Sequence, residues 1–364
     1  MNASITFRSR QRLLALGLTL LPLGLSAAPQ VNLWPESPEV GQPFQIEVQG
    51  EWAEACAPSV GDTWVEGNEI IIKLRDSAKQ CGDQPKAARV LRSPSATPLT
   101  VDTAGTFQLR VLGGTPERTR AFGLAAIGNV ELFTPESGLW WPERGGQYDT
   151  SGPGLGVQIE IQDEALALNL SGYDNTGTPF WWFAAGESQA LPQSLSLTAL
   201  KGGSGPFAKY AAPNDAMSGG TLHIEWLSSA RAVFWFVRPD LADPNAMDVR
   251  PVSMTRFAFG VRPGDSWRGD WVLLRRDASG AVIADALRFR GHKVTDTGFE
   301  LRSGDGLLLR CENDPSKPDS PPTGCSLGDR NGTLGQFSDV GLKRMQGVSR
   351  QGDLLRLSKI DDGF

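Results

Sequence analysis

The sequence of 364 residues is poor in the side chains that most often carry catalysis or bind metals. It contains only two His and four Cys, which excludes a histidine-rich metal cluster. Basic residues are not in excess, since 35 Lys and Arg stand against 41 Asp and Glu and the formal net charge is −6. General nucleic-acid binders carry a basic footprint. We therefore expect no nucleic-acid partner.

Motifs of several common enzyme classes are missing as well. The chain has no Gly-x-Ser-x-Gly, no Gly-rich phosphate loop with Gly-Lys, and no EF-hand loop, which argues against serine hydrolases, nucleotide binding and calcium binding. We therefore predict that the protein binds no cofactor and no metal and has no catalytic residue, and we expect that it is not an enzyme.

Long apolar runs are also absent after residue 28, so we expect no transmembrane segment in the mature chain. The N-terminus itself is distinctive. Arg8, Arg10 and Arg12 precede an apolar run over 13–25, and small residues follow at 26–28. This order is typical of a secretory signal peptide, and the run is too short to span a bilayer. We predict that residues 1–28 are a signal peptide, cleaved after Ser26 or Ala28, and that the protein is periplasmic or extracellular.

The four cysteines are an even set in a chain predicted to reach an oxidising compartment, so they indicate disulfides. Four cysteines allow three connectivities. Proximity in the sequence favours Cys56–Cys81 and Cys311–Cys325. A four-cysteine metal site is disfavoured because no Cys-x-x-Cys pair occurs.

The mature chain favours an all-β protein, because apolar residues recur with period two between turn residues. Phe44, Ile46 and Val48 alternate with polar neighbours, for example, and the chain holds 42 Gly and 25 Pro. No stretch shows a capped helical period. We predict an immunoglobulin-like β-sandwich at 29–112, a linker at 113–130, an antiparallel meander or barrel at 131–262, and a smaller β unit with a disulfide loop at 263–364.

The predicted strands of the last two units follow the same alternation. For 131–262 we expect eight strands, centred on 139–141, 155–161, 165–170, 180–184, 195–199, 222–227, 232–237 and 255–259. For 263–364 we expect five, at 271–274, 286–289, 299–302, 307–311 and 354–360. Both units contain Gly-x-Trp near their start, as Gly138-Leu139-Trp140 and Gly269-Asp270-Trp271.

The runs Ser137-Gly138-Leu139-Trp140-Trp141-Pro142 and Tyr173-Asp174-Asn175-Thr176-Gly177-Thr178-Pro179-Phe180-Trp181-Trp182 carry a resemblance. Residues 133–260 resemble a family of secreted proteobacterial proteins with a domain of unknown function. Residues 147–151 look like an insertion relative to that family. The resemblance implies a β fold and export, and it supplies no catalytic residues.

Aromatic residues are the strongest local signal. Because neighbours in a strand point to opposite faces, each Trp-Trp pair places one ring inward and one outward. An outward indole marks either an interaction surface, such as one that stacks on sugar rings, or a face covered by a neighbouring domain. The candidate ligand-binding residues are Trp140, Trp141, Tyr173, Trp181, Trp182 and Trp235.

Two further readings stay open. His223 and Glu225 share one strand face and form the only His–carboxylate pair of their unit, which would suit general base catalysis in a hydrolase. Asp174 is another carboxylate of this unit, but we expect it to accept hydrogen bonds within a turn rather than to act in catalysis. The second Gly-x-Trp is similar to the opening of lipocalin-like barrels. Together with the eight strands expected for 131–262, the Gly-x-Trp starts would suit a carrier, which requires a lumen for a small apolar ligand in that unit, lined by Val233, Trp235 and Val237.

The sequence therefore predicts an exported, non-catalytic β protein. Its expected partner is a surface, a polymer that includes glycans, or an envelope protein. The alternatives are a carrier of a small apolar ligand and a hydrolase.

Overall fold

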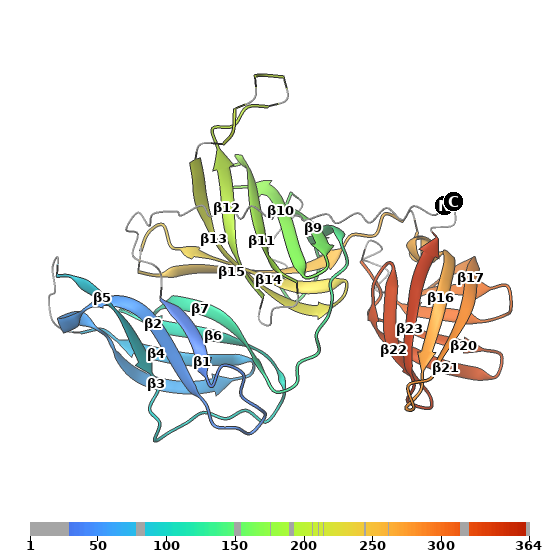
Figure 1. Cartoon of the computed structure of the whole chain (residues 1–364), viewed down its shortest axis with the longest axis horizontal. Helices are drawn as coiled ribbons and strands as arrows, with labels where there is room; N and C mark the ends of the chain where they lie inside the picture. Colours follow the sequence, from blue (N-terminus) through green and yellow to red (C-terminus); the bar gives the residue numbers. More distant parts are fainter. Residues whose placement is uncertain are drawn as a thin grey trace, which may run out of the picture.

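The computed structural model describes residues 29–361 except 78–83, 149–153, 175, 189–192, 206, 210, 214, 244, 261 and 314–319. The predicted signal peptide at 1–28 and Cys81, the expected partner of Cys56, lie outside the described residues. Within them the chain forms β-strands and two short 3-10 helices (Figure 1). No helix among them has the length and apolar character needed to cross a bilayer.

The N-terminal unit is a sandwich of two small sheets around a shared apolar core. Ile46 of one sheet and Ile72 of the other are both fully buried. The first sheet contains β1 (Gln30–Trp34), β2 (Gln45–Ala53) and β5 (Lys86–Arg92). The second contains β3 (Ser59–Glu66), β4 (Glu69–Arg75), β6 (Gly105–Gly113) and β7 (Arg118–Ile127), of which β4 and β6 run parallel. The linker predicted at 113–130 is thus mostly a strand, because β7 completes the second sheet by pairing with β6.

The middle unit is a closed antiparallel barrel of eight strands, as the alternation predicts. Each strand pairs with the next, and the last pairs with the first. The seam between β11 and β12 has the fewest ladder pairs, with Phe183 and Thr198 as its one pair within the described chain. The strands are β8 (Gly138–Pro142), β9 (Gly156–Gln162), β10 (Ala165–Tyr173), β11 (Pro179–Glu187), β12 (Gln193–Lys201), β13 (Asp215–Ser228), β14 (Arg231–Pro239) and β15 (Met247–Arg256).

The C-terminal unit is a second closed barrel of eight strands, so the expectation of five strands is wrong. The disulfide Cys311–Cys325 is confirmed, and it joins directly opposed residues of β19 and β20. The strands are β16 (Gly269–Arg276), β17 (Val282–Thr295), β18 (Gly298–Ser303), β19 (Leu308–Glu312), β20 (Gly324–Asp329), β21 (Gly332–Val340), β22 (Arg344–Ser349) and β23 (Leu354–Asp361).

The two Gly-x-Trp sequences occupy the same place in the two barrels. Trp140 and Trp271 lie on the first strand of their barrel and are fully buried. The indole Nε1 of Trp140 donates to the carbonyl of Glu136 at 3.0 Å, and that of Trp271 donates to the carbonyl of Trp267 at 2.9 Å. Each tryptophan thus binds the carbonyl four residues before it and fixes the entry of the chain into the barrel.

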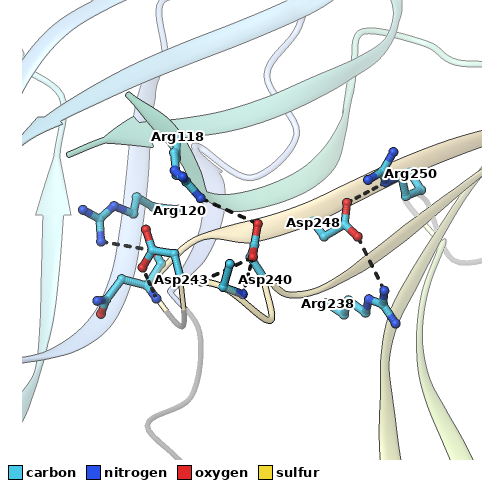
Figure 2. A network of polar contacts seen from close by, with 9 residues as sticks. Arg118, Arg120, Arg238, Asp240, Asp243, Asp248 and Arg250 are labelled. Carbon is cyan, nitrogen blue, oxygen red and sulfur yellow. Dashed lines mark hydrogen bonds and ion pairs between the residues drawn. The ribbon is translucent and has the colours of Figure 1, made fainter. Parts of the chain in front are cut away.

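The sandwich packs on the outside of the first barrel through β7. Phe122 and Leu124 of β7 lie in one apolar cluster with Val233, Trp235 and Val237 of β14. Arg118 of β7 forms an ion pair with Asp240 at 3.8 Å beside this cluster (Figure 2).

The two barrels are joined by the carboxylate of Glu136. It accepts hydrogen bonds from the backbone N–H groups of Leu342, Lys343 and Arg344 in the turn between β21 and β22, at 2.8 to 3.0 Å. Ser229 adds a second contact, because its N–H and its hydroxyl both donate to Asp339 at 2.7 Å.

Candidate functional site

The outer face of β10, β11 and β12 carries a group of exposed aromatic side chains. Trp181 is 73% exposed, Tyr173 64% and Phe183 44%. Together they are three of the six exposed aromatic side chains among the described residues. They point outward because the residues that alternate with them on these strands face the barrel core. Exposed aromatic rings gathered in this way commonly mark an interaction surface.

Small polar side chains surround these rings. Ser171 lies directly opposite Trp181, and Asn169 lies opposite Phe183 on the neighbouring strand β10. On the other side, Thr198 of β12 lies opposite Phe183. Hydroxyl and amide groups can both donate and accept hydrogen bonds. The outer face therefore offers flat apolar rings with hydrogen-bonding groups beside them, an arrangement that suits a sugar ring.

A cavity of about 720 Å³ opens at the adjoining end of the first barrel. Its lining residues come from β10, β11, β13, β14 and β15 and from the segment that leads into β9. Trp182 and Phe180 of β11 form one wall, stacked with ring centroids 4.2 Å apart. Small-molecule sites typically occupy about 300–1,000 Å³, so this barrel mouth has the size of a binding site.

The character of the inward positions changes toward this mouth. Along β14, Phe234 is buried in the core, Phe236 borders the cavity, and Arg238 follows at the rim. On β15 the same order runs from Val252 to Arg250 and Asp248. The barrel interior is therefore apolar at depth and charged where it meets solvent.

Glycines make room for the rings at the mouth. A Cβ at Gly172 would lie 2.7 Å from the ring of Phe180, and one at Gly219 would lie 3.0 Å from the indole of Trp182. Real Cβ atoms very rarely come so close to a ring. The two rings thus rest against backbone, and their positions are fixed by the absence of side chains beneath them.

The charges at the rim are arranged around Asp248. Arg250 lies 2.6 Å from one of its oxygens, and Arg238 lies 3.7 Å from the other, as Figure 2 shows. Asp174, in the β10–β11 turn, also lines the cavity. Its side chain accepts hydrogen bonds from Thr176 and Thr178, which lower its pKa. This confirms the turn role predicted for Asp174 and keeps it ionised at neutral pH.

The structure brings three of the predicted site residues together and separates the other three. Tyr173 and Trp182 line the barrel mouth, and Trp181 lies on the outer face beside them. Trp141 is half-buried against Phe257, with ring centroids 6.1 Å apart.

Two predicted residues do not suit a ligand surface. Trp140 fills the core of the first barrel, because its strand position faces inward. Trp235 is 4% exposed, since the sandwich covers it through Phe122. Sequence reasoning missed Arg238, Asp248 and Arg250, because charged residues at inward strand positions interrupt the apolar alternation that indicates a strand.

His223 and Glu225 lie under the sandwich rather than in a cleft. The imidazole of His223 contacts the ring of Phe122, with centroids 5.6 Å apart. Burial lowers the pKa of His223 to about 4 and raises the pKa of Glu225. At neutral pH the imidazole is therefore neutral, and neither His223 nor Glu225 lines the cavity at the barrel mouth. This placement does not support a role as a general base.

The lumen expected for an apolar-ligand carrier is not formed by the residues proposed for it. Val233, Trp235 and Val237 pack against β7 of the sandwich, and of the three only Val237 also borders the cavity at the barrel mouth. The core of the first barrel is filled by the opposite faces of its strands, including Trp140, Leu168 and Phe234, all fully buried. A ligand cannot occupy that part of the barrel without displacing core side chains.

Among the described residues, no group of three or more His, Cys, Asp or Glu side chains is placed to hold a metal ion. The outer face and the mouth of the first barrel bring exposed aromatic rings beside a cavity, and we take them as the candidate site. Comparison of the chain with known protein families, curated proteins and solved structures finds no match.

Proposed function

We propose that this protein is exported to the periplasm or cell exterior, where it binds a glycan polymer through the outer face of the first barrel. The Arg-rich and apolar N-terminal sequence supports export. The observation that carries the binding proposal is the exposure of Trp181, a large aromatic ring among the small polar side chains of β10 and β12.

A binding role without catalysis agrees with the rest of the site. The one His–carboxylate pair of the barrel lies under the sandwich, and the outer face carries Ser, Thr and Asn rather than acidic residues beside its rings. A flat face of this kind suits a repeating polymer, because successive sugar rings can use successive aromatic side chains. Two aromatic anchors, Trp181 and Phe183, lie on the same face of β11.

The test is a pull-down of the full mature protein with insoluble glycans, using peptidoglycan sacculi, chitin and amorphous cellulose. Trp181→Ala should lower the bound fraction on the preferred polymer by roughly tenfold, as expected when an aromatic anchor is lost. The control is Trp34→Ala, because Trp34 is also exposed, at 54%, but lies on the sandwich. Equal binding by the wild type and Trp181→Ala contradicts the proposal.

A protein partner is the competing outcome of the same experiment. Sacculi stripped of protein and sacculi with bound envelope proteins should retain equal amounts if the glycan is the ligand. Binding only to the protein-bearing sacculi would favour an envelope protein instead.

A further inference from the structure

The mouth of the first barrel is a site distinct from the outer face. Its cavity is lined by Trp182 and Phe180, which point to the opposite side of β11 from Trp181. A ligand lying only on the outer face does not reach these inward rings. The mouth is therefore a separate surface, and its lining residues indicate which class of ligand it could bind.

The lining combines one apolar wall with a polar rim. Trp182, Phe180 and Phe236 provide rings at depth, while Arg238, Asp248 and Arg250 provide charged groups at the opening. A wholly apolar ligand would displace water from these charged groups without replacing its hydrogen bonds. A ligand with a hydroxyl-rich edge and a flat apolar face would match both parts. A sugar ring has this character.

The charges at the rim balance one another. Arg238 and Arg250 both pair with Asp248, and the ionised Asp174 lies at the same opening. Two positive and two negative side chains leave no net charge for an ionic ligand. Their free N–H groups and oxygens still donate to and accept from hydroxyl groups. The rim therefore favours an uncharged sugar over a uronic acid or a sugar phosphate.

We propose that the mouth of the first barrel binds the end of a neutral glycan chain, with a terminal sugar ring against Trp182 and its hydroxyl groups on Arg238 and Asp248. Tyr173 lies between the two surfaces, since it lines the mouth and is on the outward face of β10. A chain could thus pass over Tyr173 from the mouth to the outer face. This inference rests on the proposed function, because it assigns the chain end of the same polymer.

Soluble oligosaccharides test the mouth separately from the outer face. The probes are chitotetraose and cellotetraose as neutral chains and tetragalacturonate as an acidic chain, titrated into the full mature protein by calorimetry. The side chains of Arg238 and Asp248 are 41% and 22% exposed, so Arg238→Ala and Asp248→Asn should fold even if Trp182→Ala does not. We expect at least one neutral tetramer to bind, and each variant to weaken it by roughly tenfold or more.

Trp34→Ala is the control, because Trp34 is exposed but lies on the sandwich. It should leave the tetramer affinity within roughly twofold, while Trp181→Ala should lower retention on the polymer. Binding of tetragalacturonate alone overturns the neutral-sugar assignment. Retention of the polymer without any tetramer binding, or tetramer binding that Trp181→Ala abolishes and Arg238→Ala spares, overturns the mouth site alone. Failure of the polymer pull-down with the wild type overturns the proposed function itself.

Discussion

The rings of Phe122 and Trp235 stack with their centroids 5.1 Å apart, across the boundary between the N-terminal sandwich and the first barrel. Tyr148 approaches the same indole edge-on, also at 5.1 Å. This contact explains why an outward-facing tryptophan of the barrel is not available to a ligand. It also makes the position of the sandwich on the barrel depend on a small number of aromatic side chains.

We expect Phe122→Ala to lower the free energy of unfolding by about 3 kcal/mol, the usual cost of truncating a buried Phe. Phe122 is 7% exposed, and its loss removes a ring contact from both Trp235 and His223. Urea unfolding followed by tryptophan fluorescence measures the change. Phe207→Ala is the control, because Phe207 is fully exposed and its truncation should cost less than about 0.5 kcal/mol. Equal effects of the two variants would contradict the interface.

His223 should make this interface sensitive to acid. Burial lowers its pKa from 6.5 to about 4, so between these values the unfolded chain binds a proton that the folded chain does not. Stability from this group is present above pH 6.5 and is lost as the pH falls toward 4. The shift corresponds to about 2 kcal/mol less stability at pH 5 than at pH 7.

The measurement is urea unfolding at pH 7 and pH 5 for the wild type and for His223→Phe, which keeps a ring of similar shape. The contribution of other groups, including Glu225, whose pKa is raised, is shared by both proteins. The difference between their pH dependences isolates His223. Parallel pH dependence in the two proteins would show that His223 does not carry the effect.

Glu136 offers a corresponding test between the two barrels. Burial raises the pKa of this carboxyl group, and its hydrogen bonds with Lys343 and Leu342 act in the opposite direction. In Glu136→Gln one carboxylate oxygen becomes an amide N–H₂ that faces a backbone donor. We expect a loss of about 2 kcal/mol in stability and faster proteolysis between residues 257 and 266. Glu131→Gln, at an exposed position nearby, should change neither quantity.

Period-two alternation predicted the eight strands of the first barrel because most of them bury one continuous apolar face. It misplaced the last strand, expected at 255–259 and found at Met247–Arg256. The inward positions of that strand include Asp248 and Arg250, which interrupt the apolar pattern. The charged residues that made this strand hard to predict from the sequence are thus residues that line the candidate site.

The second barrel shows a different limit. Strands β20, β21 and β22 were not expected, because glycine at positions 328, 335 and 347 interrupts their alternation. Gly347 lies so close to β21 that an added Cβ would be 1.9 Å from the carbonyl oxygen of Gln336. A glycine required by close strand packing looks in the sequence like a turn. The Gly-x-Trp sequence shared by the two barrels indicated their similarity better than the alternation within the strands of the second barrel did.

That shared start leads to a matched prediction for Trp140→Phe and Trp271→Phe. Each change keeps a ring in the core but removes the indole N–H, so the carbonyl of Glu136 or Trp267 loses its partner. An unsatisfied buried acceptor and the smaller ring together should cost about 2 kcal/mol in either barrel. Gly138 and Gly269 stand two residues before these tryptophans, with φ angles of 125° and 119°. The chain therefore enters both barrels with a similar φ angle.

The control is Trp141→Phe, next to Trp140 on the outward face, which should cost less than about 1 kcal/mol. Urea unfolding of the three variants decides the question: a cost at Trp271 no larger than at Trp141 would mean that the two barrels do not depend on the same entry contact.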